Sequence, residues 1–217
     1  MKKVFLIIFL IIAALQNSFG CINGDTKQLK DGTTISVNTE ESLVPNGNER
    51  FSFDYSKKLI ELDSLWKVTG DIDYLSDYGI VLILQKEYLK AKDIYLKIET
   101  IKPNRYSTAS NLGTVYELLG QNDNALKWIN RAIVINPRSH RNSEWLHAKI
   151  LEAKIKGEQC ITSDFLLNTN FGTEPNPQSS LTNSELLNLR EVLYYQLNER
   201  ISFIKPEDKI VAQLLFT

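Results

Sequence analysis

The sequence of 217 residues holds only two cysteines and two histidines, and it lacks the patterns of the common catalytic sites. It has no HExxH motif, no nucleophile elbow, no phosphate-binding loop and no paired-cysteine metal motif. Such patterns place a metal, a nucleophile or a phosphate-binding backbone where the chemistry needs it. Without them, we predict that the chain is not an enzyme and carries no cofactor.

An excess of charge of either sign is also lacking. The chain has 25 Lys and Arg against 26 Asp and Glu, a formal charge of −1, and no basic stripe or aromatic-interleaved basic cluster stands out. Because nucleic-acid binding needs such a basic surface, no nucleic-acid partner is expected. With 43% apolar and 24% charged residues, the composition is that of a globular chain.

The longest apolar run lies at the N-terminus. Two lysines precede an unbroken apolar run from Val4 to Leu15, and small residues come after it at Ser18 and Gly20. This is the layout of a secretory signal peptide over residues 1–20, and the run is shorter than the roughly 20 apolar residues that span a bilayer. We therefore predict an exported protein.

Cleavage after residue 20 leaves Cys21 at the mature N-terminus, the residue that bacterial lipoprotein processing modifies. Ser18 and Phe19 depart from the usual lipoprotein site, whereas Ser18 and Gly20 fit ordinary signal peptidase better. Cys160 is the other cysteine, and in an oxidising compartment a Cys21–Cys160 disulfide would contribute roughly 4–5 kcal/mol. Lipidation and disulfide formation exclude each other because both form a bond to the sulfur of Cys21. A lipidated, a disulfide-bonded and a free Cys21 therefore remain alternatives.

Residues 21–50 are polar and aperiodic, which predicts a loosely ordered lead-in with at most one short hairpin arm around Asp31 and Gly32. A helical pattern begins near Phe53, and Gly70 is a helix-stopping residue. This amphipathic helix is expected to pack as an N-terminal cap on the helices after Gly70.

A 34-residue pattern occurs twice, over residues 72–105 and 106–139. Large, small, aromatic and proline positions recur in register, at Tyr78, Gly79, Leu82, Ala91, Tyr95, Ile98 and Pro103 and again at Leu112, Gly113, Tyr116, Ala125, Ile129, Ala132 and Pro137. Each copy predicts two helices. Gly79 and Ala91 are expected to face each other and to permit a close crossing of the first pair.

A partial third unit is predicted over residues 140–160, with one helix to about Ile155, so that the helical domain covers 51–160. Residues 161–217 predict a loop and C-terminal helices, about Asn183 to Phe203 and Asp208 to Phe216.

The two copies resemble the tetratricopeptide repeat (TPR) family over about Ile72 to Ile155. The segments CINGDTKQLKDGT, SHRNSEWLHAKILEAKI and LYYQLNERISFIKP are similar to uncharacterised exported TPR proteins of Gram-negative bacteria. The resemblance implies an all-α fold, a short right-handed TPR-type solenoid of two full repeats with flanking helices. It also implies a protein-interaction scaffold of the periplasm or cell envelope, membrane-attached only through a lipid on Cys21, whose concave groove holds a peptide or protein.

Family geometry places groove-facing candidates on the first helix of each unit. They are Ser76, Ile80, Ile83, Ser107, Ser110, Asn111, Thr114, Glu117, Arg141, Glu144 and Ala148. Of the five-residue clamp with which some members hold a terminal carboxylate, only Asn111 is matched, with Arg141 in place of a lysine. Carboxylate capture is therefore not expected.

Two alternatives to the scaffold remain. One is a metal-dependent or other envelope enzyme, since His140, Glu144 and His147 share one helical face if the helix includes His140 and would then suit zinc. Ser139, Asn142 and Ser143 are plausible helix N-caps that would leave His140 outside. The other alternative is a truncated remnant of a longer TPR protein.

Overall fold

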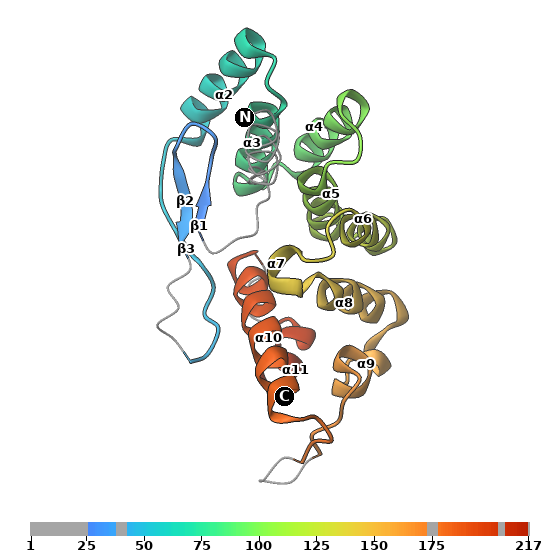
Figure 1. Ribbon diagram of the computed structural model, residues 1–217. Helices are drawn as coiled ribbons and strands as arrows, with labels where there is room; N and C mark the ends of the chain where they lie inside the picture. The colour runs from blue at the N-terminus through green and yellow to red at the C-terminus, as the bar shows by residue number, and fades with distance from the viewer. Residues whose placement is uncertain (1–25, 38–42, 173–177, 204–206, 217) are drawn as a thin grey trace, which may run out of the picture.

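The computed structural model describes residues 26–37, 43–172, 178–203 and 207–216. Helices make up 69% of the structure, and ten α-helices lie within the described residues, as an all-α fold predicts. Figure 1 shows the helices from α2 to α9 following one another around an arc, with α10 beside α7 and α8. In the described part of the chain, no helix is both long enough and apolar enough to cross a membrane. The predicted signal peptide and Cys21 lie outside the described residues.

A small antiparallel sheet precedes the helices. Strands β1 (Thr26–Gln28), β2 (Thr34–Val37) and β3 (Glu49–Arg50) pair in the order β1-β2-β3. The hairpin predicted around Asp31 and Gly32 is confirmed, but the prediction that the whole lead-in is loosely ordered is wrong for the described residues. The sheet is held because Leu29 and Ile35 are buried in the core cluster of the first helices.

Helix α2 (Tyr55–Thr69) begins and ends at residues suited to those positions. The Asp54 side chain accepts a hydrogen bond from the Lys57 backbone N–H, and Gly70 takes the left-handed conformation at φ 67° that closes the helix. The predicted stop at Gly70 is confirmed.

Two helix pairs come next, α3 (Ile72–Leu84) with α4 (Tyr88–Ile101), and α5 (Tyr106–Leu118) with α6 (Asn122–Ile135). The first helices of the pairs begin 34 residues apart, and so do the second helices. The small and large residues of the sequence pattern on α4 and α6 are all fully buried: Ala91, Tyr95, Ile98, Ala125, Ile129 and Ala132. The pattern therefore marks positions where the helices pack on one another.

Gly79 and Gly113 are the close-approach positions of the two pairs. A Cβ at Gly79 would lie 2.7 Å from Cζ of Tyr95, and one at Gly113 would lie 2.6 Å from Cγ1 of Ile129. The nearest atoms to a Cβ at Gly79 all belong to Tyr95, one turn further along α4 than Ala91. The glycine therefore makes room for this large side chain.

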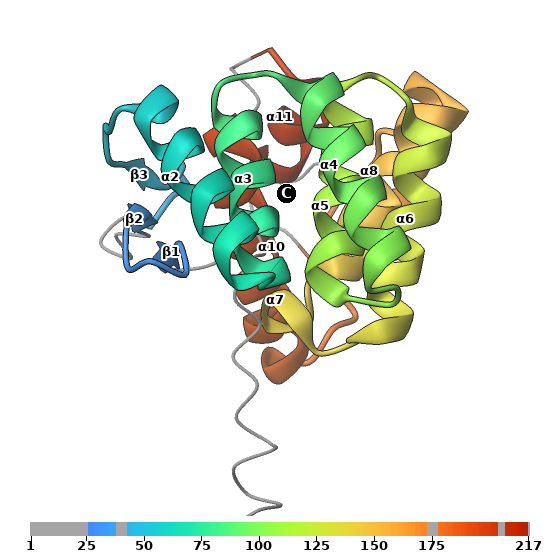
Figure 2. The same ribbon diagram turned by 90° about the horizontal axis from the view of Figure 1, so that it is seen from above.

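The remainder comprises α7 (Ser139–Asn142), α8 (Glu144–Lys156), the 3-10 turn η1 (Glu158–Cys160), α9 (Ser163–Leu167), α10 (Asn183–Phe203) and α11 (Lys209–Phe216). The predicted bounds of α10 are confirmed. A second apolar core joins α8, α9, α10 and α11 around residues such as Leu146, Ile150, Leu166, Leu197 and Leu214. Figure 2 shows α10 and α11 in the middle of the molecule, with the sheet and α2 on one side and α6 and α8 on the other.

Candidate functional site

Apart from Arg141, the predicted groove residues are not available to a partner. Ser76, Ile80 and Ile83 on α3, Ser107, Ser110, Asn111 and Thr114 on α5, and Glu144 and Ala148 on α8 are all buried. The side chain of Glu117 is only 7% exposed, whereas that of Arg141 is 41% exposed. The prediction that these residues line an open groove is wrong, because the chain fills the space with its own side chains.

Asn111 shows how the space is used. Its side-chain amide donates a hydrogen bond to the Tyr95 hydroxyl at 3.0 Å, and that hydroxyl donates to the backbone carbonyl of Ser76 at 3.0 Å. The three residues join α5, α4 and α3 inside the core, where hydrogen-bonded polar groups stabilise and unpaired ones are costly. Asn111 therefore links the two helix pairs.

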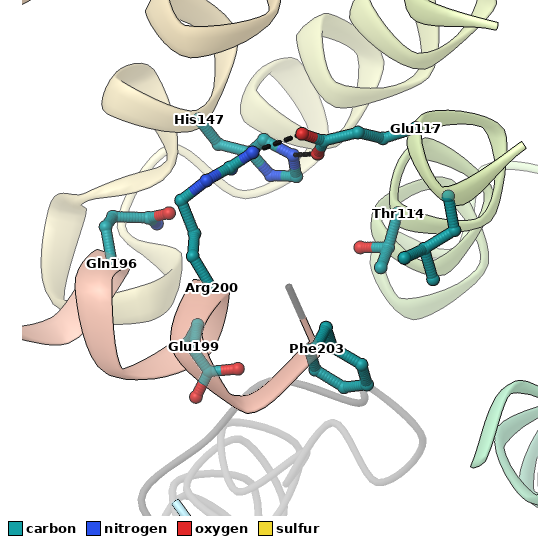
Figure 3. Close-up of a pocket in the computed structure, with 8 residues that line it drawn as sticks. Thr114, Glu117, His147, Gln196, Glu199, Arg200 and Phe203 are labelled. Atoms are coloured by element: carbon teal, nitrogen blue, oxygen red, sulfur yellow. Dashed lines mark hydrogen bonds and ion pairs between the residues drawn. The ribbon is translucent and has the colours of Figure 1, made fainter. Parts of the chain in front are cut away.

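On the side of α5 and α8 that faces α10, which we call the inner face, Glu117 is the centre of a buried charge network. Its carboxylate accepts hydrogen bonds from Nε2 of His147 at 2.7 Å, from Nζ of Lys154 at 2.7 Å and from the guanidinium of Arg200 on α10. Figure 3 shows Glu117, His147 and Arg200 pointing toward one another from three different helices. The network therefore ties α10 to both α5 and α8.

These contacts determine the direction in which the pKa values of Glu117 and His147 are shifted. Burial would raise the pKa of Glu117, but Arg200, His147 and Lys154 outweigh it and hold the pKa well below its usual range. Burial would lower the pKa of His147, but the hydrogen bond and charge of Glu117, together with the nearby Glu144 carboxylate, raise it above the usual value. The Glu117 carboxylate is therefore ionised, and the charged form of His147 is favoured.

The second histidine belongs to the same region. His140 bonds through Nδ1 to Glu144, and its ring is stacked on Tyr195 of α10 with centroids 5.6 Å apart. His147 lies 3.8 Å from the other oxygen of Glu144. Burial would raise the pKa of Glu144, but the two histidines hold it far below its usual range.

The zinc alternative depended on His140, Glu144 and His147 sharing a helical face. His140 instead lies in α7, where it, Arg141 and Asn142 have left-handed φ values of 49°, 54° and 61°. Helix α8 starts after them, with Ser143 as its N-cap. Within the described residues, no group of His, Cys, Asp and Glu has an arrangement that could hold a metal ion. The three side chains meet as ion-pair partners.

The space beside the network is small. A cavity of about 30 Å³ is lined by Thr114 and Leu118 on one side and by Gln196, Arg200 and Phe203 on the other. This volume holds about one water molecule, whereas small-molecule sites occupy roughly 300–1,000 Å³. The inner face therefore has room to hydrate a buried ion but not to bind a substrate.

Sequence reasoning missed the α10 partners of this face. Gln196, which donates to the Ser143 hydroxyl at 2.9 Å, and Arg200 lie off the apolar stripe of α10 and look like solvent-facing residues in sequence. Cys160 is a free, half-buried thiol, and its proposed partner Cys21 lies outside the described residues. No model of a protein family matches the chain, and no curated protein matches it either.

Proposed function

We propose that this chain is an exported protein-interaction scaffold of the TPR type, which acts in the periplasm or cell envelope of a Gram-negative bacterium. The 34-residue offset between the helix pairs and the burial of the pattern residues support the repeat assignment. The signal-peptide pattern of residues 1–20 supports export.

The partner surface is proposed on the outside of the helix pairs, because the inner face is filled. The observation that carries this assignment is a set of large apolar side chains left in water on α4 and α6: Leu89, Leu96, Ile101 and Val134. Val134 is 83% exposed. Scattered exposed apolar residues are ordinary, but neighbouring ones favour protein contact.

Ile101 and Val134 lie near the C-terminal ends of α4 and α6. Arg131 of α6 donates to Glu99 of α4 at 2.5 Å and to Asn104 at 2.8 Å, which holds the C-terminal ends of α4 and α6 together. Ile101 lies two residues after Glu99, and Val134 lies three residues after Arg131. A partner with an apolar face would cover both ends at once.

A photo-crosslinking residue at Val134 in the full chain tests this function in cells. We expect a discrete protein adduct from the envelope fraction. The matched control is Lys67 on α2, whose side chain is 70% exposed and lies outside the α4–α6 surface. Absence of an adduct at Val134, or the same adducts from both positions, would argue against the proposal. Val134→Glu should reduce adduct formation from a crosslinker placed at Ile101.

A further inference from the structure

The proposed partner surface on α4 and α6 carries an excess of basic residues. Residues 86–102 and 121–138 hold eight Lys and Arg against four Asp and Glu, although the whole chain has 25 against 26. Figure 1 shows both helices on the outer side of the arc, away from α10. Because the bond from Arg131 to Glu99 holds the two helices together, the fold joins two modestly basic segments into one basic surface.

Ion pairs within this surface use most of its acidic side chains. Three of the four acids have a basic neighbour, in the pairs Glu87–Lys90, Asp93–Lys92 and Glu99–Arg131. Asp123 is the fourth. Five exposed basic residues make no ion pair within the described part of the chain: Lys86, Lys97, Lys102, Lys127 and Arg138. The surface therefore presents positive charge to water that the fold itself does not neutralise.

Basic and apolar side chains share the exposed faces of the two helices. Lys127 precedes Val134 by seven residues, or two turns of α6, and Lys97 precedes Ile101 by four residues, or about one turn of α4. Val134 is 83% exposed and Ile101 is 50% exposed. A partner that covers either apolar side chain therefore comes within reach of a lysine that makes no ion pair in the described chain.

An anionic membrane also attracts basic surfaces with apolar side chains, but a helix that lies in a membrane interface needs a free apolar face. The apolar faces of α4 and α6 are used inside the protein, where Ala91, Tyr95, Ala125 and Ile129 are fully buried. What remains outside is single apolar side chains among charged ones. Apolar contacts with a polar rim are typical of a protein interface, so a protein partner is favoured.

We propose that the α4–α6 surface binds an acidic segment of its partner protein. Asp or Glu side chains of this segment pair with Lys97 and Lys127, and its apolar side chains cover Ile101 and Val134. The inference rests on the proposed function, because it names the chemistry of the partner at the same surface. Opposite charges speed the encounter and fix the orientation of the partner, and burial of the apolar side chains stabilises the complex.

The test uses the full chain with the photo-crosslinking residue at Val134, irradiated in envelope extracts at about 0.1 M and about 1 M NaCl, over which the Debye length falls from about 10 Å to about 3 Å. The yield of the protein adduct should fall about fivefold at the higher salt concentration. At the lower one, Lys127→Glu should reduce the yield about fivefold, and Lys127→Arg, which keeps the charge, should retain it. The matched control is Lys57→Glu on α2, an exposed lysine without an ion pair in the described chain, which should leave the yield unchanged.

Mass spectrometry of the adduct should place the crosslink in a segment rich in Asp and Glu. A discrete adduct that is insensitive to salt and to Lys127→Glu, or that lies in a neutral or basic segment, would overturn the acidic partner and leave the scaffold function standing. Absence of any protein adduct would overturn both. Flotation of the purified protein with phosphatidylcholine–phosphatidylglycerol vesicles that Lys127→Glu abolishes and Lys57→Glu retains would assign the surface to an anionic membrane, which also contradicts the proposal.

Discussion

Replacement of Gly79 by alanine separates helix propensity from helix packing, because the two effects have opposite signs. Propensity alone predicts that alanine in the middle of α3 stabilises the protein by about 1 kcal/mol. The packing predicts the reverse, since the new Cβ would lie 2.7 Å from Cζ, 2.8 Å from Cε2 and 2.9 Å from the hydroxyl oxygen of Tyr95. Those distances are too short for any carbon contact, so something must move.

The Tyr95 ring has little freedom to move. It is fully buried, and its hydroxyl is hydrogen-bonded to Ser76 and to Asn111. Overpacking of this kind costs about 1–3 kcal/mol, and weakening two buried hydrogen bonds costs about 1 kcal/mol each. After the gain in propensity, we expect Gly79→Ala to lose about 2–4 kcal/mol of unfolding free energy, or about 4–16 °C in Tm.

Urea unfolding measured by circular dichroism reports this loss. The control is the same substitution in a Tyr95→Leu background, where the shorter side chain removes the collision and alanine should be neutral or stabilising. If Gly79→Ala alone is as stable as the wild type or more so, the close approach of α3 and α4 is not the reason for the glycine.

Three other predictions concern buried charge. Glu117→Gln should cost about 3–5 kcal/mol in urea unfolding, because it leaves Arg200 buried beside a neutral group, and the double variant with Arg200→Gln should recover part of the loss. Burial raises the pKa of Asp77 from 3.8 to about 6, so the folded state holds this proton more tightly than the unfolded state, and the free energy of unfolding falls as pH rises between these values. Asp77→Asn should remove this fall, which is worth about 3 kcal/mol. Equal pH slopes in the variant and the wild type would refute the prediction. The pKa of His147 is raised by Glu117, so the stabilising contribution of the charged His147 is complete below its unfolded pKa of 6.5 and is lost as pH rises through the folded pKa. The difference in unfolding free energy between wild type and His147→Gln should therefore be larger at pH 6 than at pH 9.

The helices were predictable because each carries its own local signals. Gly70 ends α2 as a left-handed residue, Gly120 does the same after α5 at φ 73°, and the leucine stripe of α10 gives its bounds. The repeat adds a second, independent signal, since residues 34 apart occupy equivalent places. Local pattern and repeat agree, and both are confirmed where they specify helices.

Beyond the β1–β2 hairpin at Asp31 and Gly32, the sheet was not predictable from local pattern, and neither was the filled inner face. The strands have two to four residues, too short for alternation to be recognised, and their pairing depends on burying Leu29 and Ile35 against helices far along the chain. Helix α10 is buried on two sides, and periodicity detects only the apolar one. The partner of Arg200 is Glu117, 83 residues earlier, which no local window includes.

The Glu117 network also determines how α10 packs on the other helices. Burying a charge is costly unless it is paired, so only the register of α10 that brings Arg200 to Glu117 avoids an unpaired ion at the inner face. The same register brings the Gln196 amide to the Ser143 hydroxyl and the Tyr195 ring onto His140. Loosening the network by Glu117→Gln should therefore increase amide hydrogen exchange in α10, whereas Gly79→Ala, which destabilises α3 and α4, should increase exchange there much less than in α3 and α4.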